Sequence, residues 1–137
     1  MAAGGAGPFE NDDALDFLDD LEEADPQERR SKVESALGRV IRAKEYIEAP
    51  TMSEAIAAAV VVAASDDPES VVGERNVPRW LDEDPLEVDE RLEEFATQAL
   101  YRALRADDNE LWEILADEDA EERFSTRITH YLDALGA

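Results

Sequence analysis

Apolar residues recur every three or four positions along most of the chain, a spacing that places side chains on one face of an α-helix. The alternation typical of β-strands is missing, and β-branched residues are scattered. The pattern therefore predicts an all-α fold, a single compact domain of five to six helices around a central apolar helix. The expected helices span residues 12–23, 26–48, 52–64, 85–104, a short segment beginning at Asp107 or Asp108, and residues 119–135.

Four of these helix starts carry capping signals. Asn11 is a candidate N-cap, followed by two aspartates in the first turn, where the helix dipole favours negative charge. Asp25–Glu28 and Asp84–Glu87 each place Asp at the cap, proline at the first helical position and Glu at the third. Thr51–Glu54 has the capping-box pattern, and we expect Pro50 to end the helix before it.

The helix over residues 52–64 is nearly apolar all round, which is typical of a helix at the centre of a bundle. Residues 65–84 contain mostly turn signals and predict a long connection. We expect one domain over residues 1–137, with a glycine-rich N-terminal segment over residues 1–10. Two large apolar residues are expected to anchor the long connection to the core: Trp80 and Leu81.

The charge of the chain narrows the classes of function. Asp and Glu number 36 against 13 Lys and Arg, which gives a formal net charge of −23. Direct binding to nucleic acid or to anionic membranes needs a basic face, so both are disfavoured. The chain has no cysteine and one histidine, which excludes disulfides, thiolate catalysis and zinc sites that need sulfur or several histidines.

The composition also bears on the cellular compartment. The longest apolar run has ten residues, from Ala55 to Ala64, whereas a membrane-spanning helix needs about 20. Because the first twenty residues lack Lys, Arg and an apolar signal-peptide segment, we expect a cytoplasmic protein. Two lysines stand against eleven arginines, which fits adaptation to a salt-rich cytoplasm or GC-rich coding. Either explanation would make the acidity a property of the host cell.

The opening stretch GGAGPFENDDALDFLDDL is the most distinctive part of the sequence. It resembles the start of a bacterial and archaeal family known as domain of unknown function 4259, which typically reads Gly-Ala-Trp-Gly-x-Gly-x-Phe, then Asn-Asp-Asp-Ala and an acidic helix. The segments YIEAP, SEAIAAAVVVAA and NELWEILADED extend the likeness over nearly the whole chain. Gly4 stands where the family has its tryptophan. The resemblance implies a single helical domain, and it implies no particular enzymatic reaction. The motif residues that it singles out are Gly5, Gly7, Phe9, Asn11, Asp12 and Asp13.

The glycine-rich motif has three interpretations. A glycine loop before a helix N-terminus can cradle a phosphate. Here no strand is predicted before the motif, no Gly-Lys-Ser/Thr follows, and four carboxylates in the next turns would repel an anion. The favoured interpretation is a structural N-terminal clasp with Phe9 in the core, and a partner-binding surface is the alternative.

Carboxylates at i and i+4 spacing stack along one side of the first helix, whose acidic residues are Asp12, Asp13, Asp16, Asp19, Asp20, Glu22 and Glu23. Like charges at this spacing cost roughly a few tenths of a kcal/mol per pair. A divalent cation would relieve the repulsion, but the glycine of calcium-binding loops is missing here and around Asp117–Glu121. We therefore expect a solvated acidic face and predict no metal or cofactor. Asp16 joins the motif residues as a candidate for interaction.

Residues 28–47 are the exception to the acidity, with six basic against three acidic residues. The favoured interpretation is that this helix packs beside the acidic first helix and forms ion pairs with it, and a site for an acidic ligand is the alternative. His130 is expected to be a surface or hydrogen-bonded histidine rather than a catalyst. Ser125 and Thr126 lack the sequence context of a catalytic nucleophile.

These observations favour a non-enzymatic protein-interaction module whose partner is unidentified, with a basic protein as the leading candidate. Strong negative charge speeds association with a basic partner. A nucleic-acid mimic or an immunity-type neutraliser of a basic toxin or nuclease is the first alternative. A carboxylate-based, metal-dependent enzyme is the second. The remaining interpretation is a salt-adapted domain whose charge serves solvation alone.

Overall fold

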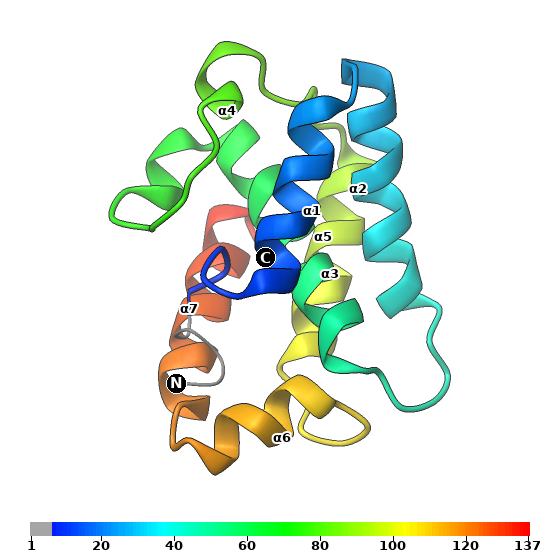
Figure 1. Cartoon of the computed structure of the whole chain (residues 1–137), viewed down its shortest axis with the longest axis vertical. Helices are drawn as coiled ribbons and strands as arrows, with labels where there is room; N and C mark the ends of the chain where they lie inside the picture. Colours follow the sequence, from blue (N-terminus) through cyan, green and yellow to red (C-terminus); the bar gives the residue numbers. More distant parts are fainter. Residues whose placement is uncertain (1–6) are drawn as a thin grey trace.

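The computed structural model describes residues 7–137 (Figure 1). Within that range the chain forms seven α-helices and one 3₁₀ helix, without a β-strand. The elements are α1 (Asp12–Glu23), α2 (Pro26–Ile41), α3 (Ala49–Asp66), η1 (Pro68–Val71), α4 (Trp80–Glu83), α5 (Glu90–Ala103), α6 (Glu110–Asp117) and α7 (Glu121–Ala134). The predicted all-α class is confirmed. The count of five to six helices is close, because α4 is a single turn of four residues.

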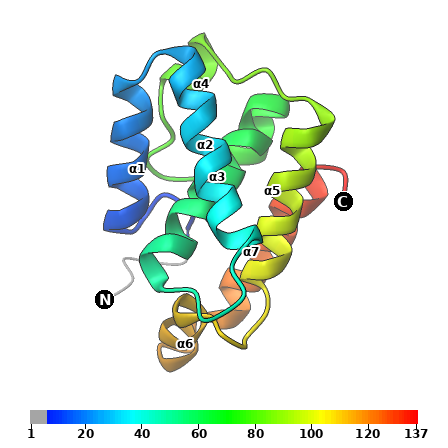
Figure 2. The same cartoon turned by 90° about the vertical axis from the view of Figure 1, so that its right-hand side faces the viewer.

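Helix α3 occupies the centre of the domain and contacts every other helix. Its sequence explains this position, because residues 55–64 are all apolar and none is more than 4% exposed. Figures 1 and 2 show α1 and α2 running antiparallel beside each other, with α6 across one end of the domain. The central apolar helix expected from the sequence is therefore confirmed.

The junction between α2 and α3 differs from the prediction. Helix α2 ends at Ile41, earlier than predicted, because the following residues leave the helix and pair with the segment before α6. The Ile47 amide donates to the Asp108 carbonyl (2.9 Å), and the Glu110 amide donates to the Ile47 carbonyl (3.0 Å). Pro50 consequently does not end the preceding helix, but lies in the first turn of α3.

The start of α5 also differs from the prediction. Asp84–Glu87 does not begin a helix, because the buried Leu86 donates its amide to Ser65 Oγ (3.1 Å) and the segment runs over the core without helical turns. The cap is Asp89, which accepts a hydrogen bond from the Leu92 amide (2.9 Å). This bond to the carboxylate lowers the pKa of Asp89.

The remaining caps divide into confirmed and wrong predictions. Asn11 and Asp25 cap α1 and α2 as predicted, each accepting a backbone amide three residues on. Thr51–Glu54 does not cap α3, since these residues already lie inside that helix. Helix α6 is capped by Asn109, whose Oδ1 accepts from the Trp112 amide (3.2 Å), and not by either of the two aspartates before it.

The connection between α3 and α5 has structure of its own. It contains the 3₁₀ turn η1 and the short helix α4. Trp80 and Leu81 of α4 are 7% and 6% exposed, which confirms that they anchor this connection to the core. The connection therefore forms part of the domain surface near α1 and α7, as Figure 1 shows.

Arg29 of α2 is buried and holds the C-terminal end of α1. Its Nε donates to the Leu21 carbonyl (2.9 Å), and its Nη2 donates to the Ala24 carbonyl (3.2 Å). The guanidinium carbon lies 4.2 Å from the centre of the Trp80 ring. The Leu21 carbonyl also accepts from the Ala24 amide (3.3 Å), so Arg29 adds a second donor to it and supplies a donor to the Ala24 carbonyl beyond the last turn of α1.

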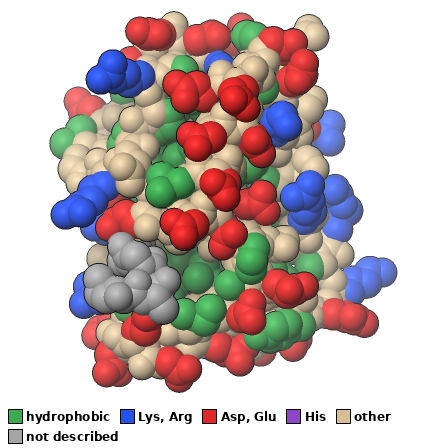
Figure 3. Space-filling view, viewed as in Figure 1, with side chains coloured by type: hydrophobic (Ala, Val, Ile, Leu, Met, Phe, Trp, Pro, Cys, Tyr) green, Lys and Arg blue, Asp and Glu red, His purple; other side chains and the backbone are tan. Residues whose placement is uncertain are grey.

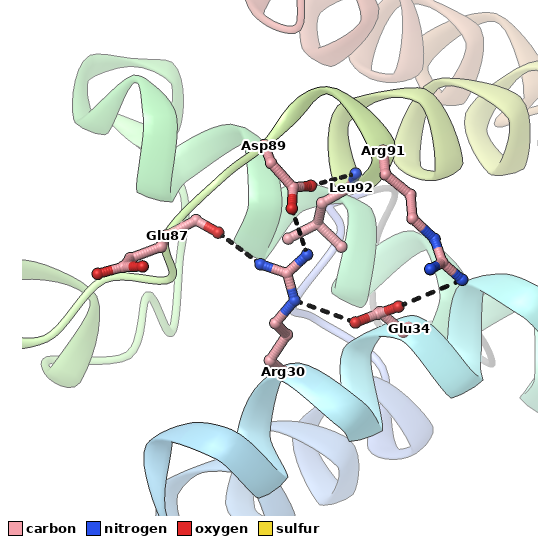
Figure 4. A network of polar contacts seen from close by, with 6 residues as sticks. All are labelled: Arg30, Glu34, Glu87, Asp89, Arg91 and Leu92. Atoms are coloured by element: carbon pink, nitrogen blue, oxygen red, sulfur yellow. Dashed lines mark hydrogen bonds and ion pairs between the residues drawn. The ribbon is translucent and has the colours of Figure 1, made fainter.

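Arg30 joins α2 to the segment before α5 (Figure 4). Its guanidinium donates to Glu34 (3.0 Å), to the Glu87 carbonyl (2.9 Å) and to Asp89 (2.8 Å). Arg91 of α5 reaches the other oxygen of Glu34 at 3.9 Å. Among the described residues, no ion pair joins α2 to an acidic residue of α1. The predicted ion pairing between these two helices is therefore wrong. Arg29, Arg30 and Arg39 pair instead with Asp84, Asp89 and Glu54, respectively.

Candidate functional site

A pocket opens between the segment before α1 and the helices α3, α6 and α7. Its volume is about 160 Å³. Most of its wall is apolar and is formed by Ile56, Leu111, Ile114, Leu115, Phe124 and Ile128. Five residues bring polar side chains to the wall, namely Asn11, Asp13, Ser53, Arg127 and Tyr131. The first two belong to the motif that the sequence singled out.

The opening motif forms one side of the pocket. Gly7 and Pro8 line it, while the Phe9 side chain turns into the core and is fully buried. A Cβ at Gly7 would meet the end of the flexible Glu10 side chain, which would have to move. Asn11 caps α1 and also lines the pocket. The motif thus supports the fold and shapes the site.

The other candidate residues lie in three different places. Gly5 lies outside the described residues, as does Gly4. Asp13 stands at the pocket and on the exposed side of α1. Asp12 and Asp16 are exposed on α1, away from the pocket wall.

The loop after η1 connects the motif to α7. Gly73 has a φ of +90°, which turns the chain so that Glu74 points inward with a side chain 5% exposed. Glu74 accepts hydrogen bonds from the Tyr131 hydroxyl and from the Arg127 guanidinium. Asn76 donates from Nδ2 to the Phe9 carbonyl (2.9 Å). Three distant segments of the sequence therefore meet beside the pocket.

Electrostatics in this cluster favour a protonated phenol and a charged guanidinium. Burial and the hydrogen bond to Glu74 raise the pKa of Tyr131. The hydrogen bond from Arg127 to Glu74 raises the pKa of Arg127. Sequence reasoning did not identify these three residues as a site. The one available signal is the i, i+4 spacing of Arg127 and Tyr131, which places both on one face of α7.

Helix α6 forms the wall opposite α1 and is held by the loop before α3. Tyr46 donates its hydroxyl to Glu113 (2.7 Å), which raises the pKa of Tyr46 to about 12. The Ala49 amide donates to Glu110 Oε1 (2.7 Å). Asn109 is fully buried and donates to the carbonyls of residues 103 and 105. These bonds position the apolar residues of α6 over the pocket.

Ser53 supplies a polar group deep in the pocket wall. It is 3% exposed and lies on α3, among apolar neighbours. Its hydroxyl is a polar group on a wall that is otherwise mostly apolar.

The seven acidic residues of α1 form an exposed face, called here the α1 acidic face. Figure 3 shows a column of Asp and Glu side chains over this helix. Among the described residues, no Lys or Arg nitrogen lies within 4.0 Å of these carboxylates. The expected exposure of this face is therefore confirmed, although the expected pairing with α2 is not.

The pKa of Glu54 on α3 is affected by the negative charges of this face. Partial burial is the main cause that raises the pKa of Glu54, and Arg39 at 4.0 Å opposes it. The charges of Asp13 and Asp20 on α1 raise it further. The α1 acidic face is thus a region of crowded negative charge.

Other side chains considered from the sequence have structural partners. His130 Nε2 lies 2.7 Å from the Ser70 carbonyl, and its ring packs edge-on against Tyr131. Thr126 donates its hydroxyl to the Glu122 carbonyl (3.0 Å). In residues 7–137, no three His, Asp or Glu side chains are grouped so that they could share a metal ion. None of the helices described has the length and apolarity needed to cross a membrane.

Comparison with known proteins gives a family and no nearer relative. No curated protein and no solved structure matches the chain. A family model described as a domain of unknown function matches residues 2–127, which include the opening motif, α3 and α6. The chain therefore belongs to the DUF4259 family, as its opening motif indicates.

Proposed function

We propose that the protein is a non-enzymatic interaction module that binds a basic protein over the α1 acidic face. The observation that carries this proposal is the exposed column of carboxylates on α1, for which the described residues supply no ion-pair partner. Lys and Arg side chains of a partner would relieve the repulsion between these groups. The negative field would also speed the encounter with that partner.

The chemistry of the pocket supports binding more than catalysis. Its wall is mostly apolar, and the charge of Arg127 is balanced by Glu74. A general base must lie within reach of a substrate, whereas Glu74 is not among the residues that line the pocket and its two oxygens accept from Arg127 and Tyr131. An immunity-type protein that neutralises a basic toxin or nuclease is one member of the proposed class.

The test measures binding of a basic probe, the peptide Ac-Lys-Lys-Ala-Lys-Lys-NH2, by two-dimensional NMR titration at about 0.1 M salt, where screening acts over about 10 Å. One variant neutralises the α1 acidic face with D12N, D16N and D20N. A matched variant neutralises three acidic residues at the start of α5 with E90Q, E93Q and E94Q. Both remove three negative charges, so net charge is the same in each.

We expect the largest shifts on α1 and a loss of about tenfold in affinity for the α1 variant, since each exposed ion pair is worth about 0.2–1 kcal/mol. The α5 variant should lose less than about threefold. Equal losses would mean that the peptide responds only to net charge, and the proposed function would be rejected.

A further inference from the structure

The pocket is large enough for one aromatic ring or one branched apolar side chain. Its volume is about 160 Å³. An apolar protein cavity of about 150 Å³ is large enough to bind benzene. The wall includes the aromatic side chain of Phe124 and the branched side chains of Ile56 and Ile128. Such a surface gains free energy when an apolar group replaces water.

The pocket is continuous with the α1 acidic face. Asp13 belongs to both, since it lines the pocket and is exposed on α1. Ile114 of α6 stands on the opposite wall and is only half-buried. A chain that lies on the carboxylates of α1 therefore passes beside the pocket opening.

The charges around the pocket determine whether a positively or a negatively charged ligand is favoured there. The positive charge of Arg127 is offset by Glu74, which accepts its hydrogen bond. Asp13 contributes a carboxylate without an ion-pair partner among the described residues. Ser53 adds one buried polar side chain to a wall that is otherwise mostly apolar. An apolar group flanked by positive charges fits this arrangement, whereas an apolar anion would be repelled.

We propose that the pocket receives one aromatic or branched apolar side chain of the basic protein partner, while flanking Lys or Arg residues contact the α1 acidic face. This inference rests on the proposed function and adds the anchor of the complex. Buried apolar anchors in pockets carry much of the binding energy of protein interfaces, and surrounding charges govern encounter and specificity.

The test compares three peptides by the same NMR titration with the intact protein. The first is Ac-Lys-Lys-Phe-Lys-Lys-NH2, and the second is the alanine peptide used above. The third, Ac-Glu-Glu-Phe-Glu-Glu-NH2, has the same ring with opposite charge. Burial of the ring should make the first peptide bind at least about tenfold more tightly than the second. Its shifts should include pocket residues such as Leu111 and Ile128.

Two tryptophan variants test the location. I114W places a large side chain at the pocket and should reduce binding of the phenylalanine peptide to that of the alanine peptide. Y101W, on an exposed residue of α5 that does not line the pocket, is the matched control and should leave binding unchanged. Circular dichroism and thermal unfolding establish that both variants are folded.

The outcomes separate this inference from the proposed function. If both lysine peptides bind α1 with equal affinity, the anchor is rejected and the proposed function stands. If neither lysine peptide binds α1, the proposed function fails and the anchor fails with it. If the phenylalanine ring enters the pocket equally well between lysines and between glutamates, the pocket is a site for apolar compounds in general, and a charge-directed protein anchor is rejected.

Discussion

Replacement of Glu74 tests whether the loop after η1 holds α7 in place. Glu74 accepts one hydrogen bond from the hydroxyl of Tyr131, which is fully buried. It accepts another from Arg127, whose side chain is 43% exposed. Solvent screens the bond with Arg127, which is therefore worth no more than about 1 kcal/mol. A hydrogen bond from a buried hydroxyl to a carboxylate is worth about 1.5–3 kcal/mol. We expect E74L to lose about 3 kcal/mol of unfolding free energy, and E74Q, which keeps an acceptor, about 1 kcal/mol.

The assay is urea unfolding followed by far-ultraviolet circular dichroism at neutral pH, in a double-mutant cycle with Tyr131→Phe. Much of the cost of E74L comes from leaving the buried hydroxyl without an acceptor. In the Tyr131→Phe background that hydroxyl is gone, so E74L should cost about 1–2 kcal/mol less. An equal cost of E74L in both backgrounds would show that Glu74 and Tyr131 are not energetically coupled, and would refute the account of the loop given above.

Three further predictions concern other parts of the fold. D16N removes two like-charge contacts at i, i+4 spacing on α1 and should stabilise the protein by about 0.5 kcal/mol at low ionic strength. Thermal unfolding in about 1 M NaCl should show a smaller gain in stability, because salt screens the repulsion. A gain that does not depend on salt would contradict this cause. E113Q should lower the pKa of Tyr46 from about 12 in an alkaline ultraviolet titration, because the carboxylate favours the protonated phenol. The stability gained from this raised pKa is complete below about pH 10, the ordinary phenol pKa, and is lost as the pH rises through about 12. An unchanged Tyr46 titration in E113Q would exclude the hydrogen bond. R29M keeps an apolar stem against Trp80 but removes two hydrogen bonds to α1, and should cost about 2 kcal/mol in urea unfolding; a loss below about 0.5 kcal/mol would show that these bonds do not stabilise the helix end.

The helices could be predicted well where local chemistry decides them. Residues 55–64 are apolar all round, and the structure buries them at the centre. Asn11 and Asp25 cap their helices because the bond that each accepts comes from only three residues away. The α2 boundary could not be predicted, since Ile47 leaves the helix for a partner before α6, more than sixty residues later.

The same distinction applies to the candidate site. The opening motif stood out in the sequence, and Asn11 and Asp13 do line the pocket. Glu74 did not stand out, because one more carboxylate among 36 Asp and Glu residues carries no signal. Its partners on α7 lie more than fifty residues away, and only the tertiary fold brings them together.

The contacts of Glu74 and Asn76 have a consequence for protein synthesis. The pocket draws its walls from the opening motif, α3, α6 and α7, and the loop joins the first of these to the last. A nascent chain therefore cannot assemble the pocket until α7 has left the ribosome, even though the acidic helix has long been exposed by then. Under the proposed function, a basic protein would meet the charged surface of a nascent chain before the pocket exists. The proposed anchor would then strengthen binding only once the fold is finished.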